Sequence, residues 1–83
     1  MEFIYTHKAA SQLEALHQTI QKRIAKKMRF YANQENPLRF AERLVEQREG
    51  EYRFRIGDYR IFFDVIGKKV FILAIKKRDK AYE

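Results

Sequence analysis

The stretch at residues 50–65, GEYRFRIGDYRIFFDV, decides how this chain folds. Aromatic and β-branched residues alternate with arginines on both sides of Gly57 and Asp58, which is the pattern of two strands joined by a tight turn. Glycine at the first of two turn positions favours a type II′ hairpin, because that position needs a positive φ. We therefore predict strands over residues 51–56 and 59–65.

The two-residue turn determines which side chains share a face of this hairpin. Arg55 should pair with Arg60, and Arg53 should lie on the same face, because side chains alternate along a strand. Like charges in facing positions destabilise a hairpin by up to about 1 kcal/mol, so a carboxylate or an anionic ligand must compensate. We favour a phosphate, since the planar guanidinium fork matches phosphate oxygens. The residues expected on the other, helix-covered face are Tyr52, Phe54, Ile56, Tyr59, Ile61 and Phe63.

The N-terminal half predicts one strand and two helices. Residues 2–6 have strand composition, and Thr6 can cap a helix over residues 7–16. A second helix over residues 18–32 should end at the proline-containing segment 33–37 and form an antiparallel hairpin with the first. Apolar residues recur at helical spacing, and those expected to face the core are Ala9, Leu13, Leu16, Ile20, Ile24, Met28 and Tyr31.

The remaining segments complete a small sheet. A helical turn after Pro37 should lead into a short strand near residues 43–47. The apolar run at residues 70–75, VFILAI, predicts a strand covered on both faces. We expect an odd-length loop around Gly67, which would turn Phe71, Leu73 and Ile75 toward the helices. The same loop would place on the arginine face Val70, Ile72, Ala74, Lys76 and Arg78.

These elements predict one α+β domain over residues 1–83. In it, an N-terminal strand and an antiparallel helical hairpin pack on one face of a small antiparallel β-sheet. Without cysteine, disulfides and cysteine-based metal clusters are excluded, which fits a reducing cytoplasm. No apolar run approaches the length needed to cross a membrane, so we expect a soluble, cytoplasmic protein.

The formal net charge of +7 predicts a polyanionic partner: nucleic acid, the ribosome or an acidic protein. His7 and His17 do not have the spacing of a helical metal pair, and we expect no metal or cofactor. The acids before and within the hairpin are interpreted as surface charge; they are Glu35, Glu42, Glu46, Glu49 and Glu51. The cations interpreted as contacts to RNA and the ribosome are Lys22, Arg23, Lys26, Lys27, Arg29, Lys76 and Lys77.

The chain resembles the RelE/ParE superfamily of toxins from bacterial and archaeal toxin–antitoxin systems. The resemblance covers nearly the whole chain and includes NPLRF at residues 36–40 and ILAIKKRDKAY at residues 72–82. Its most specific parts are a Tyr-Arg-x-Arg-x-Gly-x-Tyr-Arg block at residues 52–60 and an Arg-Asp-x-x-Tyr motif at residues 78–82. The resemblance implies a RelE-like fold and a cognate antitoxin whose acidic or amphipathic segment covers the arginines. It also implies operator DNA binding through the antitoxin complex.

Proteins of the RelE branch cut messenger RNA in the ribosomal A site by attack of a ribose 2′-hydroxyl on the adjacent phosphate. By motif position, Arg60 and Arg78 resemble the residues that hold the scissile phosphate, and Tyr82 the tyrosine near the substrate base. Arg53 and Arg55 stand where the best-known members carry two lysines, one of them proposed as the general base. Because guanidinium remains protonated above pH 12, proton removal would fall to Tyr82, another group or the ribosome.

Two alternatives remain open at the level of sequence. The ParE branch shares the fold and poisons DNA gyrase without a nuclease site. The joint presence of Arg60, Arg78 and Tyr82 favours the RelE branch. A nucleic-acid-binding module without catalysis is the other alternative, and the replacement of the two lysines is its main support.

Overall fold

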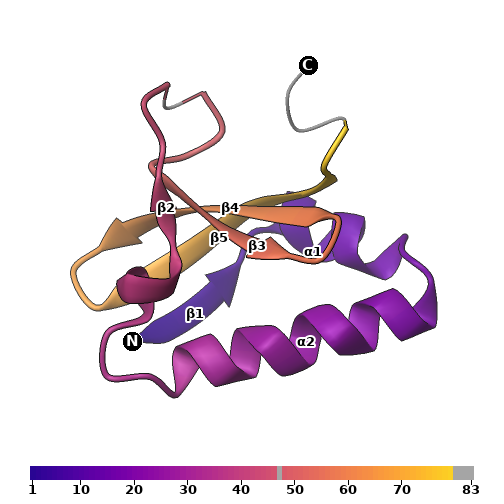
Figure 1. Ribbon diagram of the computed structural model, residues 1–83, viewed down its shortest axis with the longest axis horizontal. Coiled ribbons are helices and arrows are strands. Elements are labelled where there is room, and N and C mark those ends of the chain that lie inside the picture. Colours follow the sequence, from indigo (N-terminus) through magenta and orange to yellow (C-terminus); the bar gives the residue numbers. More distant parts are fainter. Residues whose placement is uncertain (47, 80–83) are drawn as a thin grey trace.

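The computed structural model describes residues 1–46 and 48–79 and contains a curved five-stranded sheet with helices against it (Figure 1). The strands lie in the order β1-β5-β4-β3-β2. The elements, in chain order, are β1 (Glu2–Tyr5), α1 (His7–Glu14), α2 (Gln18–Ala32), the 3₁₀ helix η1 (Pro37–Phe40), β2 (Glu42–Arg43), β3 (Tyr52–Ile56), β4 (Tyr59–Ile66) and β5 (Lys69–Lys77). Every predicted element is present, although the strand expected near residues 43–47 lies slightly earlier as β2.

The predicted α+β fold class is confirmed, with one correction to the sheet. The sheet is mixed, because β1 pairs in parallel with β5, with Glu2 opposite Lys69. Parallel neighbours need a long crossover connection, and the chain between these two strands contains both helices and three further strands. Sequence periodicity predicts that a strand exists, but it does not reveal which distant strand becomes its neighbour.

Side-chain caps explain where the helices begin. The backbone N–H of Ala9 donates to Thr6 Oγ1 at 3.2 Å, which confirms the predicted cap of α1. At the start of α2, the N–H of Thr19 donates to His17 Nδ1 at 3.2 Å. His17 therefore has a structural role, since a capping side chain satisfies an N–H that has no partner within the helix.

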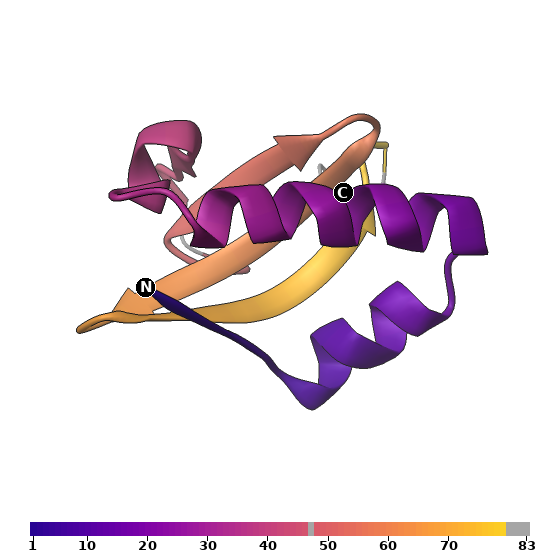
Figure 2. The same ribbon diagram turned by 90° about the horizontal axis from the view of Figure 1, so that it is seen from below.

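The core lies between α2 and the sheet, and α2 runs across one sheet face (Figure 2). Tyr31 of α2 stacks on Phe54 with ring centroids 4.2 Å apart, and Phe54 stacks on Phe63 at 4.5 Å. Offset aromatic pairs of this kind add to the free energy gained from burying apolar surface. The predicted apolar face of the β3–β4 hairpin is thereby confirmed as the core face.

The β3–β4 turn also agrees with the prediction. Ile56 pairs with Tyr59, which leaves Gly57 and Asp58 as a two-residue turn. Gly57 has a φ of +57°, whereas Asp58 does not have a positive φ, as a type II′ turn requires. Arg55 and Arg60 consequently face each other across the hairpin.

The predicted odd-length loop between β4 and β5 is wrong. Ile66 pairs with Lys69, so the loop has two residues, and Val70 and Ile72 rather than Phe71 face the core. An even loop reverses the side-chain alternation of the following strand relative to the prediction. The expected helix-facing positions of Phe71 and Leu73 are therefore wrong, and Val70 and Ile72 do not lie on the arginine face.

A β-bulge restores the predicted alternation in the second half of β5. Phe63 pairs with Ile72 and Phe62 pairs with Ala74, so Leu73 is an extra residue without a partner in β4. One additional residue shifts the alternation by one position. Beyond the bulge, Ile75 is buried in the core as predicted, and Lys76 pairs with Arg60.

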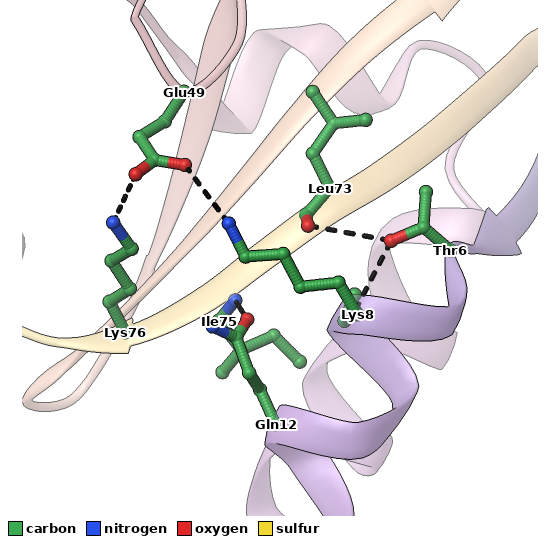
Figure 3. Close-up of polar contacts among 8 residues, drawn as sticks. Thr6, Lys8, Gln12, Glu49, Leu73, Ile75 and Lys76 are labelled. Carbon is green, nitrogen blue, oxygen red and sulfur yellow. Dashed lines mark hydrogen bonds and ion pairs between the residues drawn. The ribbon is translucent and has the colours of Figure 1, made fainter.

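Side chains of the first helical segment complete the edge of β5 where β1 ends (Figure 3). Thr6 Oγ1 donates to the carbonyl oxygen of Leu73 at 3.4 Å. The N–H of Ile75 donates to Gln12 Oε1 at 2.7 Å. Backbone groups of β5 beyond the end of β1 are thus satisfied, which a partly buried strand requires.

Candidate functional site

The sheet face opposite α2 carries the candidate site. The described part of the loop after β2 and residues 78–79 both lie on this side of the sheet (Figure 1). The register places Arg55 of β3, Arg60 of β4 and Lys76 of β5 on this face. The bulge at Leu73 is essential for this arrangement, because without it Lys76 would point to the core face. We refer to these three residues and Arg53 as the cationic face.

Arg60 occupies the centre of the cationic face and is largely buried. The residue is 5% exposed, and its Nη1 donates to the carbonyl oxygens of Gly57 and Tyr59, both at 3.0 Å. Its Nε is buried and has no hydrogen-bond partner among the described residues. Arg60 therefore braces the hairpin turn, and an anion that reached its Nε would satisfy a donor whose burial otherwise costs free energy.

Arg78 lies beside the same turn. Its backbone N–H donates to the carbonyl oxygen of Asp58 at 2.6 Å, and the residue is exposed. The structure thus brings Arg60 and Arg78, which are 18 positions apart in the sequence, to the same two-residue turn. Tyr82, the remaining predicted residue near the substrate base, lies outside the described residues.

A carboxylate already neutralises the arginines of β3. Glu42 Oε1 lies 2.7 Å from Arg55 Nε, and Glu42 Oε2 lies 3.4 Å from Arg53 Nη2. Glu42 is exposed, as expected of a surface charge, and in addition forms these two ion pairs. The ion pairs arise because β2 places Glu42 directly opposite Arg53. A strand of two residues gives no periodic signal, so the sequence alone did not reveal this neighbour.

Glu49 forms a second ion-pair cluster on the cationic face. Its carboxylate contacts Lys76 Nζ through one oxygen and lies 3.9 Å from Lys8 Nζ through the other (Figure 3). Glu49 is partly exposed, but its pairing with these lysines was not expected from the sequence. Sequence reasoning also missed Lys8, which α1 brings to this face. The only sequence signal was the glycine that follows Glu49, which marks a close approach of the loop to the sheet.

Asp64 of β4 is engaged by the backbone of the loop that precedes β3. Its Oδ1 accepts a hydrogen bond from the N–H of Glu51 at 2.8 Å. Asp64 therefore fixes the end of the loop that carries Glu49. This loop, rather than an isolated side chain, shapes the border of the cationic face.

The basic residues of α2 form a separate surface on the other side of the sheet. A shallow groove connects the two surfaces at the edge of β3, where Arg55 approaches the helix. Lys27 Nζ lies over the rings of Phe30 and Tyr31, at 5.1 and 5.5 Å from their centroids. The exposed cations of α2 are Lys22, Arg23, Lys26, Lys27 and Arg29. Lys77 is exposed at the end of β5.

Other chemical groups are poorly placed for catalysis. Burial raises the pKa of the Tyr5 and Tyr31 phenols, so both remain protonated at neutral pH. No three His, Cys, Asp or Glu residues come together as a metal site within residues 1–46 and 48–79.

None of the helices in this part of the chain combines the length and apolar character needed to span a bilayer.

Comparisons with known proteins agree with this architecture. A family model described as "ParE toxin of type II toxin-antitoxin system, parDE" matches residues 3–82. A chain in the crystal structure of the toxin–antitoxin complex RelBE2 from Mycobacterium tuberculosis superimposes with a TM-score of 0.75. It is 24% identical, and the match covers 93% of this chain and 96% of that one, which shows a shared fold. A search of curated proteins finds no match. The protein therefore belongs to the ParE toxin family, within the RelE/ParE superfamily of type II toxin–antitoxin toxins.

Proposed function

We propose that this toxin is a ribosome-dependent endoribonuclease that cuts messenger RNA in the ribosomal A site. The observation that carries the proposal is the bulge at Leu73, which sets Lys76 opposite Arg60 on the face where Arg55 is exposed. Arg78 reaches the turn that Arg60 braces. Several cations converging on one face suit a phosphodiester, because guanidinium and ammonium groups donate strong hydrogen bonds to phosphate oxygens.

In the proposed reaction, a ribose 2′-hydroxyl attacks the adjacent phosphorus while the bond to the 5′ oxygen breaks. The products are a cyclic phosphate end and a 5′-hydroxyl end. Arg60 and Arg78 hold the scissile phosphate and stabilise the negative charge that develops on it. Arg55, on the neighbouring strand, assists these two arginines. Arg53, which like Arg55 pairs with Glu42, supports Arg55. Tyr82 would stack on a substrate base.

Inhibition of DNA gyrase is the second candidate function. It is favoured by the family model, whose description names ParE. It is also favoured by Glu42, because a carboxylate that pairs with Arg53 and Arg55 competes with any phosphate for these two cations. In this case the cationic face and α2 would bind a protein or DNA surface without cutting RNA.

The expected partners follow from charge and from the structural relative. The relative was crystallised as a toxin–antitoxin complex, so a cognate antitoxin with an acidic or amphipathic segment is the expected neutralising partner. The cations of α2, together with Lys76 and Lys77, are proposed to contact the ribosome and its messenger RNA. Operator DNA would be bound through the antitoxin complex. With these partners, the toxin is proposed to act in the cytoplasm.

Primer extension on messenger RNA bound to translating ribosomes tests the proposed site. Arg78→Ala should lower the cleavage rate by about 100-fold or more, because one lost charge-stabilising donor typically costs that much. For Arg60, the variant should be Arg60→Lys, since alanine would also remove the two hydrogen bonds that brace the turn. Arg39→Ala, at an exposed position of η1, is the matched control and should cut normally. Full cleavage by both site variants would rule out the assignment.

A further inference from the structure

We infer that Glu49 accepts the proton of the attacking 2′-hydroxyl. The inference rests on the proposed ribonuclease function, which requires a base that the arginines cannot supply. Guanidinium remains protonated at every pH at which the protein is folded. His17 is occupied as the cap of α2, and the buried tyrosines lie in the core. Among the described residues on the cationic face, Glu42 and Glu49 are carboxylates that can take up a proton, and Glu42 is paired with both arginines of β3.

The contacts of Glu49 hold its carboxylate beside the cationic face. One oxygen is bound by Lys76, which pairs with Arg60 across the two central strands. The other oxygen lies 3.9 Å from Lys8 Nζ of α1 (Figure 3). The Glu49 side chain is 30% exposed, so a substrate can reach it. Two ammonium groups therefore orient the carboxylate, and they reduce its repulsion of a phosphodiester.

The loop that carries Glu49 is fixed against the sheet at the next two residues. A Cβ atom at Gly50 would lie 3.0 Å from the carbonyl oxygen of Phe63 and 3.1 Å from Leu73 Cδ1, so a larger residue would force the loop and the sheet slightly apart. The next N–H, that of Glu51, donates to Asp64 at 2.8 Å. A general base must be held within hydrogen-bond reach of its proton, and these contacts provide the support.

The charged groups around Glu49 come from every neighbouring element. Lys8 of α1 and Lys76 of β5 contact it directly. Arg48, Glu51 and Asp64 line the same shallow pocket together with Gly50 and Leu73. Arg48 is paired with Glu46 at 3.2 Å and Asp64 with the Glu51 N–H. The two lysines are therefore the cations nearest to the Glu49 carboxylate.

The proposed step balances without a cofactor. The proton moves from the 2′ oxygen to the Glu49 carboxylate as the bond from that oxygen to phosphorus forms. The bond from phosphorus to the 5′ oxygen breaks, and the departing oxygen takes a proton from water. The resulting hydroxide removes the proton from Glu49, which returns as a carboxylate for the next turnover.

Single-turnover cleavage of ribosome-bound messenger RNA between about pH 6 and 8 tests this role. The wild-type rate should change little over this range, because a protein carboxylate rather than hydroxide takes the proton. Glu49→Gln should be at least about 100-fold slower, and its residual rate should rise about tenfold per pH unit, because hydroxide must then remove the proton. Glu49→Asp should recover part of the rate. Glu46→Gln, in the same loop, is the control and should behave like the wild type.

Three results would overturn the assignment. The first is wild-type cleavage by Glu49→Gln, and the second is faster cleavage, which would make the carboxylate a competitor of the phosphate. The third is a slower rate with wild-type pH dependence, which would show that Glu49 only holds the loop. If the wild-type protein itself does not cut, the proposed function fails together with this inference. The wild-type reaction in the same experiment thus separates the two failures.

Discussion

Glu42 illustrates how one residue changes the chemistry of a cationic strand. The sequence correctly predicts that Arg55 faces Arg60, and the energetic cost of this pair correctly implies a nearby anion. The anion in the structure is a carboxylate from β2, which pairs with Arg53 and Arg55. The alternation of side chains along β3 and β4 identifies which of their residues share a face. It cannot identify an acid on β2, a neighbouring strand of only two residues.

Gly50 supports a prediction at the scale of a single residue. Gly50→Ala should lower the free energy of unfolding by about 1–3 kcal/mol, because the added Cβ meets backbone and the φ of +154° is unfavourable for alanine. Urea denaturation measures the loss. Gly67→Ala is the matched control, because Gly67 has a φ of +61° but nothing within 4 Å of an added Cβ. Equal losses for the two variants would show that the close approach at Gly50 contributes nothing.

At the scale of elements, β5 shows where sequence periodicity is insufficient. An almost continuous apolar run predicts a strand, but its side-chain alternation is hidden because both faces accept apolar residues. The bulge at Leu73 therefore could not be foreseen. Its effect is that Val70 and Ile72 face the core before it and Ile75 faces the core after it. Lys76 reaches the predicted face through this bulge and a two-residue loop, not through the expected odd loop.

The contact between α1 and β5 gives the prediction at this scale. Gln12→Ala should lower the free energy of unfolding by about 1–3 kcal/mol, because it leaves the partly buried N–H of Ile75 without its acceptor. Urea denaturation reports the stability, and amide hydrogen exchange reports the N–H of Ile75 directly. Gln18→Ala, at an exposed position of α2, should change little. Unaltered exchange at Ile75 would contradict the role assigned to Gln12.

At the scale of the whole molecule, the cations lie on two sides of the sheet. The cationic face is opposite α2, whose own basic residues form the second surface (Figure 1). The net charge of +7 predicts a polyanionic partner, but only the fold shows that two separate surfaces exist. The parallel pairing of β1 with β5 was likewise not predictable, because it joins segments about 70 residues apart.

The two surfaces predict how salt should affect binding to ribosomes. Replacing both Lys22 and Lys26 by Gln should weaken binding and reduce the slope of log K against log salt concentration by about 1–2, because fewer counterions are released. Filter binding at several salt concentrations measures this slope. The same replacement of Lys68, in the β4–β5 turn, and Lys69, at the start of β5, removes equal charge away from α2 and should have less effect. Equal effects of the two pairs would indicate binding through net charge alone.

The most direct test of the central claim is to assay one purified, folded preparation of the toxin on two substrates. The first is messenger RNA on translating ribosomes, with naked RNA as control, and the second is DNA with gyrase. We predict cleavage in the A site that requires the ribosome, and no gyrase-dependent DNA breaks. DNA breaks without RNA cleavage would contradict the account and assign gyrase as the target. Salt-sensitive binding without either reaction would contradict it as well, and would leave a nucleic-acid-binding protein without catalysis.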